Sequence, residues 1–183
     1  MVITIQMPTL YEKQKIFFYW DSLYPQSRIL IAPSGTKVGK SFASAIWLAT
    51  KALTKKGSYC LWIAPTYLKS KIGFRYCRRL IPQITGNRIV EGALEIRLNN
   101  DSLIKFIHGA DPEITIEGEN VDFFVIDEAG KTDEQIYYSL LTTITQRQGK
   151  GIITGTPRGK NWYYYEYLKA LSGDKFFTAA SLK

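Results

Sequence analysis

The sequence contains few of the residues that build metal centres or disulfide frameworks. Its 183 residues include two cysteines, Cys60 and Cys77, and one histidine, His108. The cysteines form no CxxC pair and have no histidine beside them, so the sequence predicts neither a zinc site nor a disulfide framework. His108 follows a strand-like run and precedes a glycine, and we interpret it as structural.

Long apolar segments are also missing. No apolar run approaches the ~20 residues that a transmembrane helix needs, and residues 1–14 lack the basic and apolar segments of a secretory signal. We therefore expect no contact with a membrane and a location in a reducing cytoplasm.

Positive charge, in contrast, is abundant. The chain has 24 Lys and Arg against 16 Asp and Glu, a net charge of +8. Such a surplus favours a polyanionic partner, because phosphate contacts release counterions. The composition, 45% hydrophobic and 22% charged, is ordinary for a folded protein. We expect one globular domain over residues 1–183.

Short apolar runs alternate with helical patterns along the chain. Strands are expected at 28–33, 58–65, 121–127, 150–154 and 175–180, and helices at 40–53, 67–80, 133–142 and 161–171. Continuous apolar runs are typical of buried parallel strands. Residues 88–107 alternate instead, which predicts antiparallel hairpins inserted at the sheet edge. The expected fold class is α/β: a mostly parallel sheet flanked by helices, with an inserted antiparallel β-hairpin region.

The most informative motif is SGTKVGKS, which stands between an expected strand and an expected helix, as a phosphate-binding P-loop does. Backbone N–H groups of such a loop form a nest for phosphate oxygens. Lys40 would reach the β and γ phosphates of ATP, and the Ser41 hydroxyl would bind Mg²⁺. The predicted nucleotide-binding residues of the loop are Ser34, Gly35, Thr36, Lys37, Val38, Gly39, Lys40 and Ser41. Ser34 stands where the motif usually has its first glycine, and an incidental glycine-rich turn is the alternative.

An apolar run that ends in two carboxylates, VDFFVIDE, has the Walker B pattern. Asp127 would hold Mg²⁺, and Glu128 would orient and deprotonate the attacking water. Alone, such residues usually begin a solvated loop, but downstream of a P-loop the catalytic interpretation dominates. A glutamate directly after the aspartate indicates the RecA-like (ASCE) branch of P-loop ATPases.

Two further residues are candidates for the same site. Thr156, in the run IITGTPRG, could sense the γ-phosphate and couple it to another surface, although a plain Gly and Pro turn is the alternative. The amide of Gln14 could read the adenine edge. A surface glutamine on an opening helix is the alternative for Gln14.

The segments SGTKVGKS, VDFFVIDEAG and TGTPRGKNWYYYEY together resemble the ATPase domain of a tailed-bacteriophage large terminase. The likeness spans nearly the whole chain. It implies a Mg²⁺-dependent ATPase motor that moves double-stranded DNA into a procapsid in the cytoplasm of the infected host. It also implies a homo-oligomeric ring on the portal, a monomer when the domain is isolated, and the small terminase subunit as a partner. The family's C-terminal nuclease needs a carboxylate cluster that this chain lacks, so an isolated ATPase domain is expected.

The chain departs from the family pattern at two places. Thr36 stands where terminases often have an arginine, and LLTTITQRQG stands where an Arg-Pro pair is common. We therefore predict that Arg147, in a polar loop, is an arginine finger acting in trans on a neighbouring subunit. Lys37, acting in cis, is the competing candidate, and a solvated surface arginine is the plain alternative.

Two segments could contact DNA. The first carries cations at Lys69, Lys71, Arg75, Arg78 and Arg79, although a solvated basic helix face is an equal alternative. The second carries aromatic residues at Trp162, Tyr163, Tyr164, Tyr165 and Tyr167. Consecutive residues of a helix cannot share one face, so some of these aromatics must belong to the core.

Two other functions fit the same motifs. One is a helicase-like or remodelling ATPase, which ordinarily needs a second RecA-like domain. The other is an assembly module that binds ATP but hardly hydrolyses it.

Overall fold

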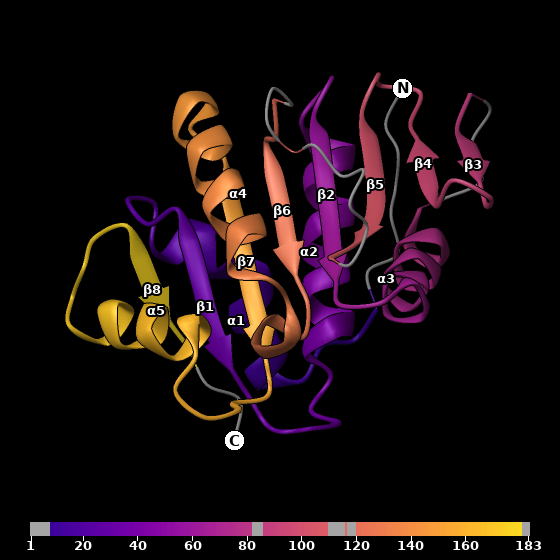
Figure 1. Cartoon of the computed structure of the whole chain (residues 1–183). Coiled ribbons are helices and arrows are strands. Elements are labelled where there is room, and N and C mark those ends of the chain that lie inside the picture. The colour runs from indigo at the N-terminus through magenta and orange to yellow at the C-terminus, as the bar shows by residue number, and fades with distance from the viewer. Residues whose placement is uncertain (1–7, 82–85, 110–115, 117–119, 181–183) are drawn as a thin grey trace.

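The computed structural model describes residues 8–81, 86–109, 116 and 120–180. Within them one sheet has the strand order β3-β4-β5-β2-β6-β7-β1-β8 (Figure 1). The strands are β1 (Ile29–Pro33), β2 (Tyr59–Ala64), β3 (Arg88–Val90), β4 (Glu95–Arg97), β5 (Leu103–His108), β6 (Phe123–Ile126), β7 (Lys150–Gly155) and β8 (Phe177–Ala179). From β5 to β8 all neighbours are parallel, whereas β3 and β4 pair antiparallel. The predicted α/β fold with a mostly parallel sheet is confirmed.

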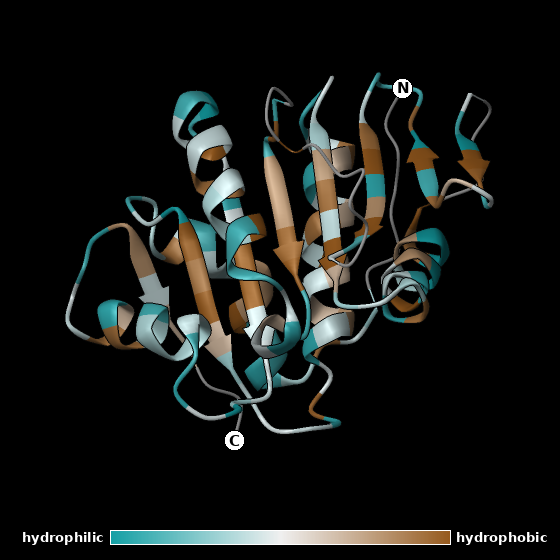
Figure 2. Cartoon of the chain, in the orientation of Figure 1, coloured by the Kyte–Doolittle hydropathy of each residue, from teal (hydrophilic) through white to brown (hydrophobic). Residues whose placement is uncertain are grey.

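Helices cover both faces of this sheet. The helices are α1 (Glu12–Leu23), α2 (Lys40–Thr54), α3 (Tyr67–Leu80), α4 (Glu134–Arg147) and α5 (Trp162–Leu171), with a 3₁₀ turn η1 (Ala129–Lys131) after β6. The first three lie on one face, and α4 and α5 lie on the other (Figure 1). The central strands are apolar along their length because both of their faces are covered (Figure 2).

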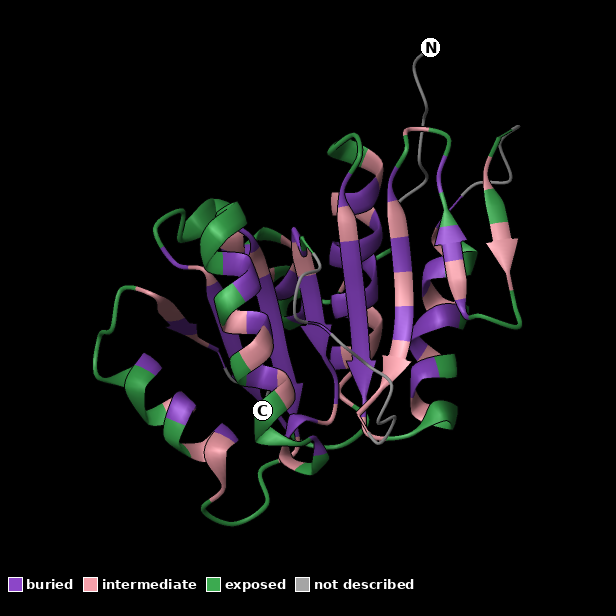
Figure 3. Ribbon diagram, turned by 45° about the horizontal axis from the view of Figure 1, so that its top comes forward, coloured by how far each residue is buried: buried purple, intermediate pink, exposed green. Residues whose placement is uncertain are grey.

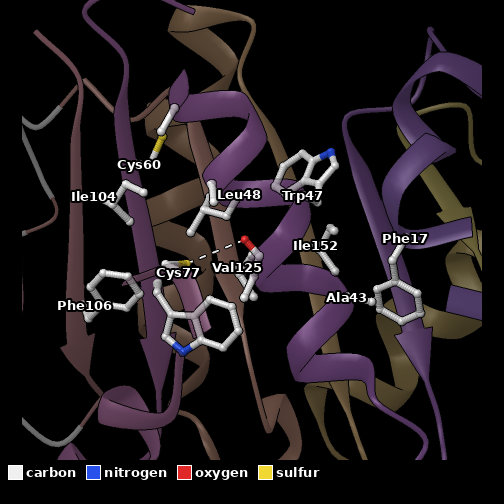
Figure 4. Close-up of a cluster of buried hydrophobic side chains, with 14 of the residues drawn as sticks. Phe17, Ala43, Trp47, Leu48, Cys60, Cys77, Ile104, Phe106, Val125 and Ile152 are labelled. Carbon is white, nitrogen blue, oxygen red and sulfur yellow. Dashed lines mark hydrogen bonds between the residues drawn. The ribbon is translucent and has the colours of Figure 1, made fainter. Parts of the chain in front are cut away.

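The core therefore has two halves, one on each side of the sheet. Phe17, Trp47 and Cys77 bring α1, α2 and α3 together over Ile104, Val125 and Ile152 (Figure 4). On the other face Tyr137, Leu140 and Tyr163 pack α4 and α5 against Phe124 and Ile153. The outer faces of α4 and α5 stay exposed while their inner residues are buried (Figure 3).

Both cysteines belong to the first half of the core. They are free and buried, and burial raises the pKa of Cys60 to about 12 and that of Cys77 still further from its ordinary value. The Cys77 thiol points to the Ala45 carbonyl oxygen at 3.6 Å. Both residues are therefore packing residues.

Gly73 lets α3 lie directly on β2. A Cβ atom at this position would come within 2.3 Å of the Trp62 ring, so no larger residue fits unless the helix moves away. The opposite side of α3, which carries most of its cations, faces solvent. The close packing thus fixes where those cations lie.

Two details differ from the sequence prediction. The expected hairpins are present, but β5 pairs antiparallel with β4 and parallel with β2, so it joins the hairpin region to the main sheet. Helix α4 runs five residues further than 133–142, and Arg147 is its last residue. The prediction that Arg147 lies in a loop was wrong, because the helix ends only where Gln148 adopts a left-handed conformation with φ 53°.

A buried carboxylate holds the edge of the sheet where β2 and β6 begin. Asp122 is 1% exposed and accepts a 2.9 Å hydrogen bond from the Tyr59 N–H. It also forms ion pairs with Lys55 (2.6 Å) and with Nε of Arg147 (3.7 Å). These contacts compensate its desolvation and tie together the ends of α2 and α4.

None of the described helices combines the length and the apolar character that crossing a bilayer requires.

Candidate active site

The three motifs singled out in the sequence meet at one edge of the sheet. Strands β1, β6 and β7 are parallel neighbours, so their carboxyl ends lie side by side (Figure 1). The P-loop (residues 34–41) follows β1, Asp127 and Glu128 follow β6, and Thr156 follows β7. Ligands of open α/β sheets bind outside the carboxyl ends of the strands.

The P-loop leads from β1 into the first turn of α2. Lys37 and Gly39 have positive φ values of 61° and 82°, which turn successive N–H groups toward one side, as a phosphate nest requires. The N–H of Ser34 donates to the Gly155 carbonyl oxygen at 3.0 Å. Ser34 is buried and does not have a positive φ, so its backbone does not require the glycine that usually stands there, whereas Thr36 and Lys37 are exposed.

Lys40 is 5% exposed and its ammonium group is held by protein oxygens. Nζ donates to the Gly35 carbonyl oxygen at 3.0 Å and to Oγ1 of Thr156 at 3.4 Å. The second contact joins residues 116 positions apart in the chain. Lys40 therefore links the P-loop directly to the residue predicted to act in coupling.

Asp127 and Ser41 offer oxygen ligands at the floor of the site. Asp127 is 3% exposed, and burial raises its pKa to about 6, although a hydrogen bond with Ser41 and the charge of Lys40 lower it. A buried carboxylate beside a hydroxyl has the donor atoms that Mg²⁺ prefers, and a cation would balance its desolvated charge. These residues fit a magnesium site completed by substrate phosphates.

Glu128 has a strained backbone. Its φ of 58° and ψ of 42° lie in the left-handed region, which costs a non-glycine residue ~1–2 kcal/mol. Its N–H donates to Oδ1 of Asp127 at 3.1 Å, and its Oε2 lies 3.6 Å from Nζ of Lys131. Strain of this kind concentrates at functional sites. The sequence reasoning missed Lys131, whose i+3 spacing from Glu128 would have indicated the pair had the 3₁₀ turn been expected.

Gln14 lies against the P-loop. It is 6% exposed, and a Cβ on Gly39 would come within 2.1 Å of its Nε2 atom. Its Oε1 accepts a hydrogen bond from the Tyr11 N–H at 3.1 Å. The alternative of a surface glutamine is therefore excluded, and adenine recognition by Gln14 stays a prediction.

A mainly apolar cavity of about 410 Å³ adjoins the P-loop on the α5 side. Pro33, Val38 and Pro157 line it together with Tyr163 and Tyr164. Tyr163 is buried while Tyr165 is half exposed. As expected, some aromatic residues of this segment belong to the core.

Arg147 is not part of this constellation. It is the last residue of α4 and lies beside Asp122 at the start of β6, that is, at the amino ends of the parallel strands and opposite the P-loop (Figure 1). An action on the nucleotide of its own subunit is excluded by this position. An action in trans stays a prediction, and so does the competing role of Lys37, which lies in the P-loop.

Comparison with known proteins identifies relatives. Residues 32–181 match the family described as "Terminase large subunit, T4likevirus-type, N-terminal". The chain is 32% identical over 150 residues to the terminase large subunit of Escherichia phage T5, and 25% identical over 166 residues to that of Thermus virus P23-45. Both matches cover 78% of this chain and 34% of the relative, so the chain spans about a third of the length of these relatives.

Solved structures share the fold. The large terminase ATPase domain of Thermus phage P74-26 superposes with a TM-score of 0.80 at 20% identity, covering 94% of this chain and 80% of that chain. The large terminase of a thermophilic bacteriophage in complex with ADP gives a TM-score of 0.74 at 15% identity, covering 95% of this chain and 46% of that chain. The fold agrees with the family match over nearly all of the sequence. The chain therefore belongs to the terminase large subunit family, whose N-terminal region it matches.

Proposed function

We propose that this chain is the ATP-hydrolysing motor domain of a large terminase, which drives double-stranded DNA into a procapsid. The observation that carries the proposal is the meeting of Lys40, Asp127, Glu128 and Thr156 at one edge of the sheet. Structures of a thermophilic phage's large terminase in complex with ADP and with ATP-gamma-S support a nucleotide as ligand. The family match favours this function over a helicase-like ATPase.

In this proposal the P-loop binds the phosphate chain through its N–H groups, and Lys40 contacts the β and γ phosphates. Ser41 and Asp127 would hold Mg²⁺, which neutralises phosphate charge when bound. Glu128 orients a water molecule and accepts its proton as the water oxygen bonds to the γ-phosphorus. The bond to the bridging oxygen breaks, and ADP and phosphate leave. Thr156, through its contact with Lys40, carries the state of the γ-phosphate toward α5.

Lys40→Ala is expected to abolish binding of a non-hydrolysable ATP analogue in the presence of Mg²⁺. The variant removes an ammonium group that lies buried inside the P-loop. Isothermal titration calorimetry measures the affinity. Lys56→Ala, which removes the same charge from an exposed position, is the matched control and should bind like the parent. An unchanged affinity in Lys40→Ala would remove the phosphate-site assignment.

For DNA we propose the exposed face of α3. Lys71, Arg75 and Arg79 follow one another at four-residue spacing, about 6 Å apart along the helix axis. Among the described residues, none of the three has an acidic partner, whereas the neighbouring Arg78 pairs with Glu91. Unpaired cations in a row can each neutralise a phosphate of a DNA strand.

The triple variant Lys71→Ala, Arg75→Ala, Arg79→Ala is expected to weaken DNA binding. It should also reduce the slope of log affinity against log salt by about 3, because each phosphate contact contributes about 0.9. Fluorescence anisotropy with a labelled duplex at several salt concentrations measures both quantities. A control that removes three exposed lysines elsewhere, Lys13, Lys56 and Lys175, carries the same change in net charge. Equal losses in the two triple variants would show that net charge, and not α3, is responsible.

A further inference from the structure

The turn that follows Glu128 is fastened to the start of α5. The side-chain amide of Asn161 donates from Nδ2 to the Gly130 carbonyl oxygen at 3.2 Å. Next to it, Nε1 of Trp162 donates to the Thr132 carbonyl oxygen at 2.9 Å. Two adjacent residues at the N-terminus of α5 thus satisfy two carbonyl groups of the segment 128–132, about 30 residues earlier in the chain.

The backbones of the two segments also lie so close that a side chain at either glycine would be crowded. A Cβ on Gly155 would lie 3.0 Å from the Ala129 nitrogen and 3.4 Å from the carbonyl carbon of Glu128. A Cβ on Gly130 would lie 3.4 Å from the Thr156 carbonyl oxygen. The left-handed Glu128 and the turn that follows it therefore pack closely against the end of β7 and Thr156.

The start of α5 is itself a firm anchor. The Trp162 ring stacks on Tyr137 of α4, with centroids 4.8 Å apart and planes inclined by 17°. The Tyr137 hydroxyl donates to the buried carboxylate of Glu166 at 2.9 Å. Because α4 and α5 are joined through this buried contact, the two hydrogen bonds to the turn start from a fixed frame.

Asn161 has two separable functions. Its Oδ1 accepts a hydrogen bond from the Tyr164 N–H at 3.2 Å and so caps α5. Its Nδ2 makes the bond to Gly130. An aspartate or a serine caps a helix as well as asparagine does, but aspartate has no donor and serine is too short to keep both contacts.

We infer that Asn161 and Trp162 are positioning residues for Glu128. They hold the turn 129–132 in place. Glu128 thereby keeps its left-handed backbone conformation, and its carboxylate keeps the same orientation in the site. The inference rests on the proposed function, in which Glu128 takes the proton of water. It adds that the loop carrying Thr156 and the proposed base move as one body, so a displacement of one repositions the other.

The first experiment compares Asn161→Asp and Asn161→Ser with the parent in full-length subunits under assembling conditions. Both variants keep the cap and lose the bond to Gly130, and the serine variant adds no charge. We expect kcat to fall by about 10- to 100-fold, the cost of misplacing a catalytic group, with affinity for a non-hydrolysable ATP analogue within about 2-fold of the parent. A general loss of structure would lower both kcat and the affinity for the analogue, so a fall in kcat alone distinguishes the positioning role.

A second readout does not depend on turnover. Hydrogen exchange should accelerate at the N–H groups of Lys131 and Thr132, which close the turn onto Glu128 and Ala129, while the melting temperature stays near that of the parent. Trp162→Phe keeps the stacking ring and removes its donor, so it should act in the same direction. The double variant Asn161→Ser, Trp162→Phe should lose less than the product of the single effects, because both bonds hold one unit.

Failure of the positioning role and failure of the proposed function give different results. Parental kcat together with parental exchange at 131–132 in Asn161→Asp and Asn161→Ser would overturn the positioning role. A parent without turnover in the assembled state would overturn the proposed function, and the exchange rates alone would then decide whether Asn161 fastens the turn.

Discussion

Glu128→Gln is expected to retain nucleotide binding and to lower the rate of ATP turnover by about 10² to 10⁴-fold, the range typical of removing a general base. The amide has the shape of the carboxylate, but it cannot take up the proton of the attacking water. Phosphate release under single-turnover conditions measures the rate, and calorimetry with a non-hydrolysable analogue measures the affinity. Turnover within a few fold of the parent would show that another residue is the base.

Two controls isolate the effect of the base. Glu134→Gln makes the same change of charge at an exposed position in the first turn of α4, where the carboxylate accepts from Tyr138, and it should be fully active. Lys131→Ala removes the ion pair of Glu128 but leaves the carboxylate in place. If Lys131→Ala alone reproduced the full loss, the ion pair and not the proton transfer would be limiting.

Arg147→Ala is expected to lower turnover by about 10³ to 10⁵-fold in the assembled motor, the usual contribution of an arginine finger. Lys40 and Mg²⁺ leave part of the γ-phosphate's transition-state charge uncompensated. Arg147 lies beside Asp122, at the amino ends of the strands and away from the nucleotide site of its own subunit. It could therefore reach only the nucleotide site of a neighbouring subunit. Its guanidinium is about half exposed beside Asp122, which leaves it accessible to such a neighbour.

A mixing experiment tests the action in trans. Glu128→Gln subunits with an intact Arg147 are added to Arg147→Ala subunits with an intact Glu128, and turnover is measured under conditions that support assembly. Partial recovery is expected, because an active site in one subunit then receives the arginine of its neighbour. Assemblies of each variant alone provide the baseline, and no recovery in the mixture would contradict the trans role.

The ion pair with Asp122 offers a competing, purely structural role for Arg147. If the arginine serves only to compensate this buried carboxylate, its loss lowers the melting temperature and leaves turnover intact, with Lys55 still in place at 2.6 Å. Arg147→Lys separates the two roles. It keeps a positive charge near Asp122 but lacks the guanidinium fork, so it should keep stability and lose turnover. Full activity of Arg147→Ala would transfer the role to Lys37.

Periodicity in the sequence predicted most of the fold. Helix α3 begins and ends where expected, since its apolar residues recur at helical spacing and the helix stops at Ile81, which has an extended backbone and precedes Pro82 in the sequence. The end of α4 was missed because TTITQR lacks that spacing and contains β-branched threonines. The structure shows why the helix continues: Thr143 and Ile144 are buried together with Leu140 on the inner side of α4, and this packing outweighs the low helix propensity of the segment.

The site was predictable to the extent that its residues follow strands. Strand order brings Lys40, Asp127 and Thr156 to one edge, and each motif could be recognised from its own local pattern. The fastening of Asn161 to Gly130 could not be recognised, because the two residues are 31 positions apart and neither has a distinctive neighbourhood. The burial of Gln14 could not be recognised either, because it depends on a distant residue, Gly39, having no side chain.

The contacts of Lys40 also affect the entropy of binding. An ammonium group has three N–H donors, and two of them already bond to Gly35 and Thr156. The third can be shared between the β and γ phosphates, so the side chain need not be reordered when a nucleotide arrives. Fixing a free lysine costs up to ~2 kcal/mol, roughly a 30-fold factor in affinity. In this chain that cost is incurred during folding, which leaves the P-loop preorganised for its ligand.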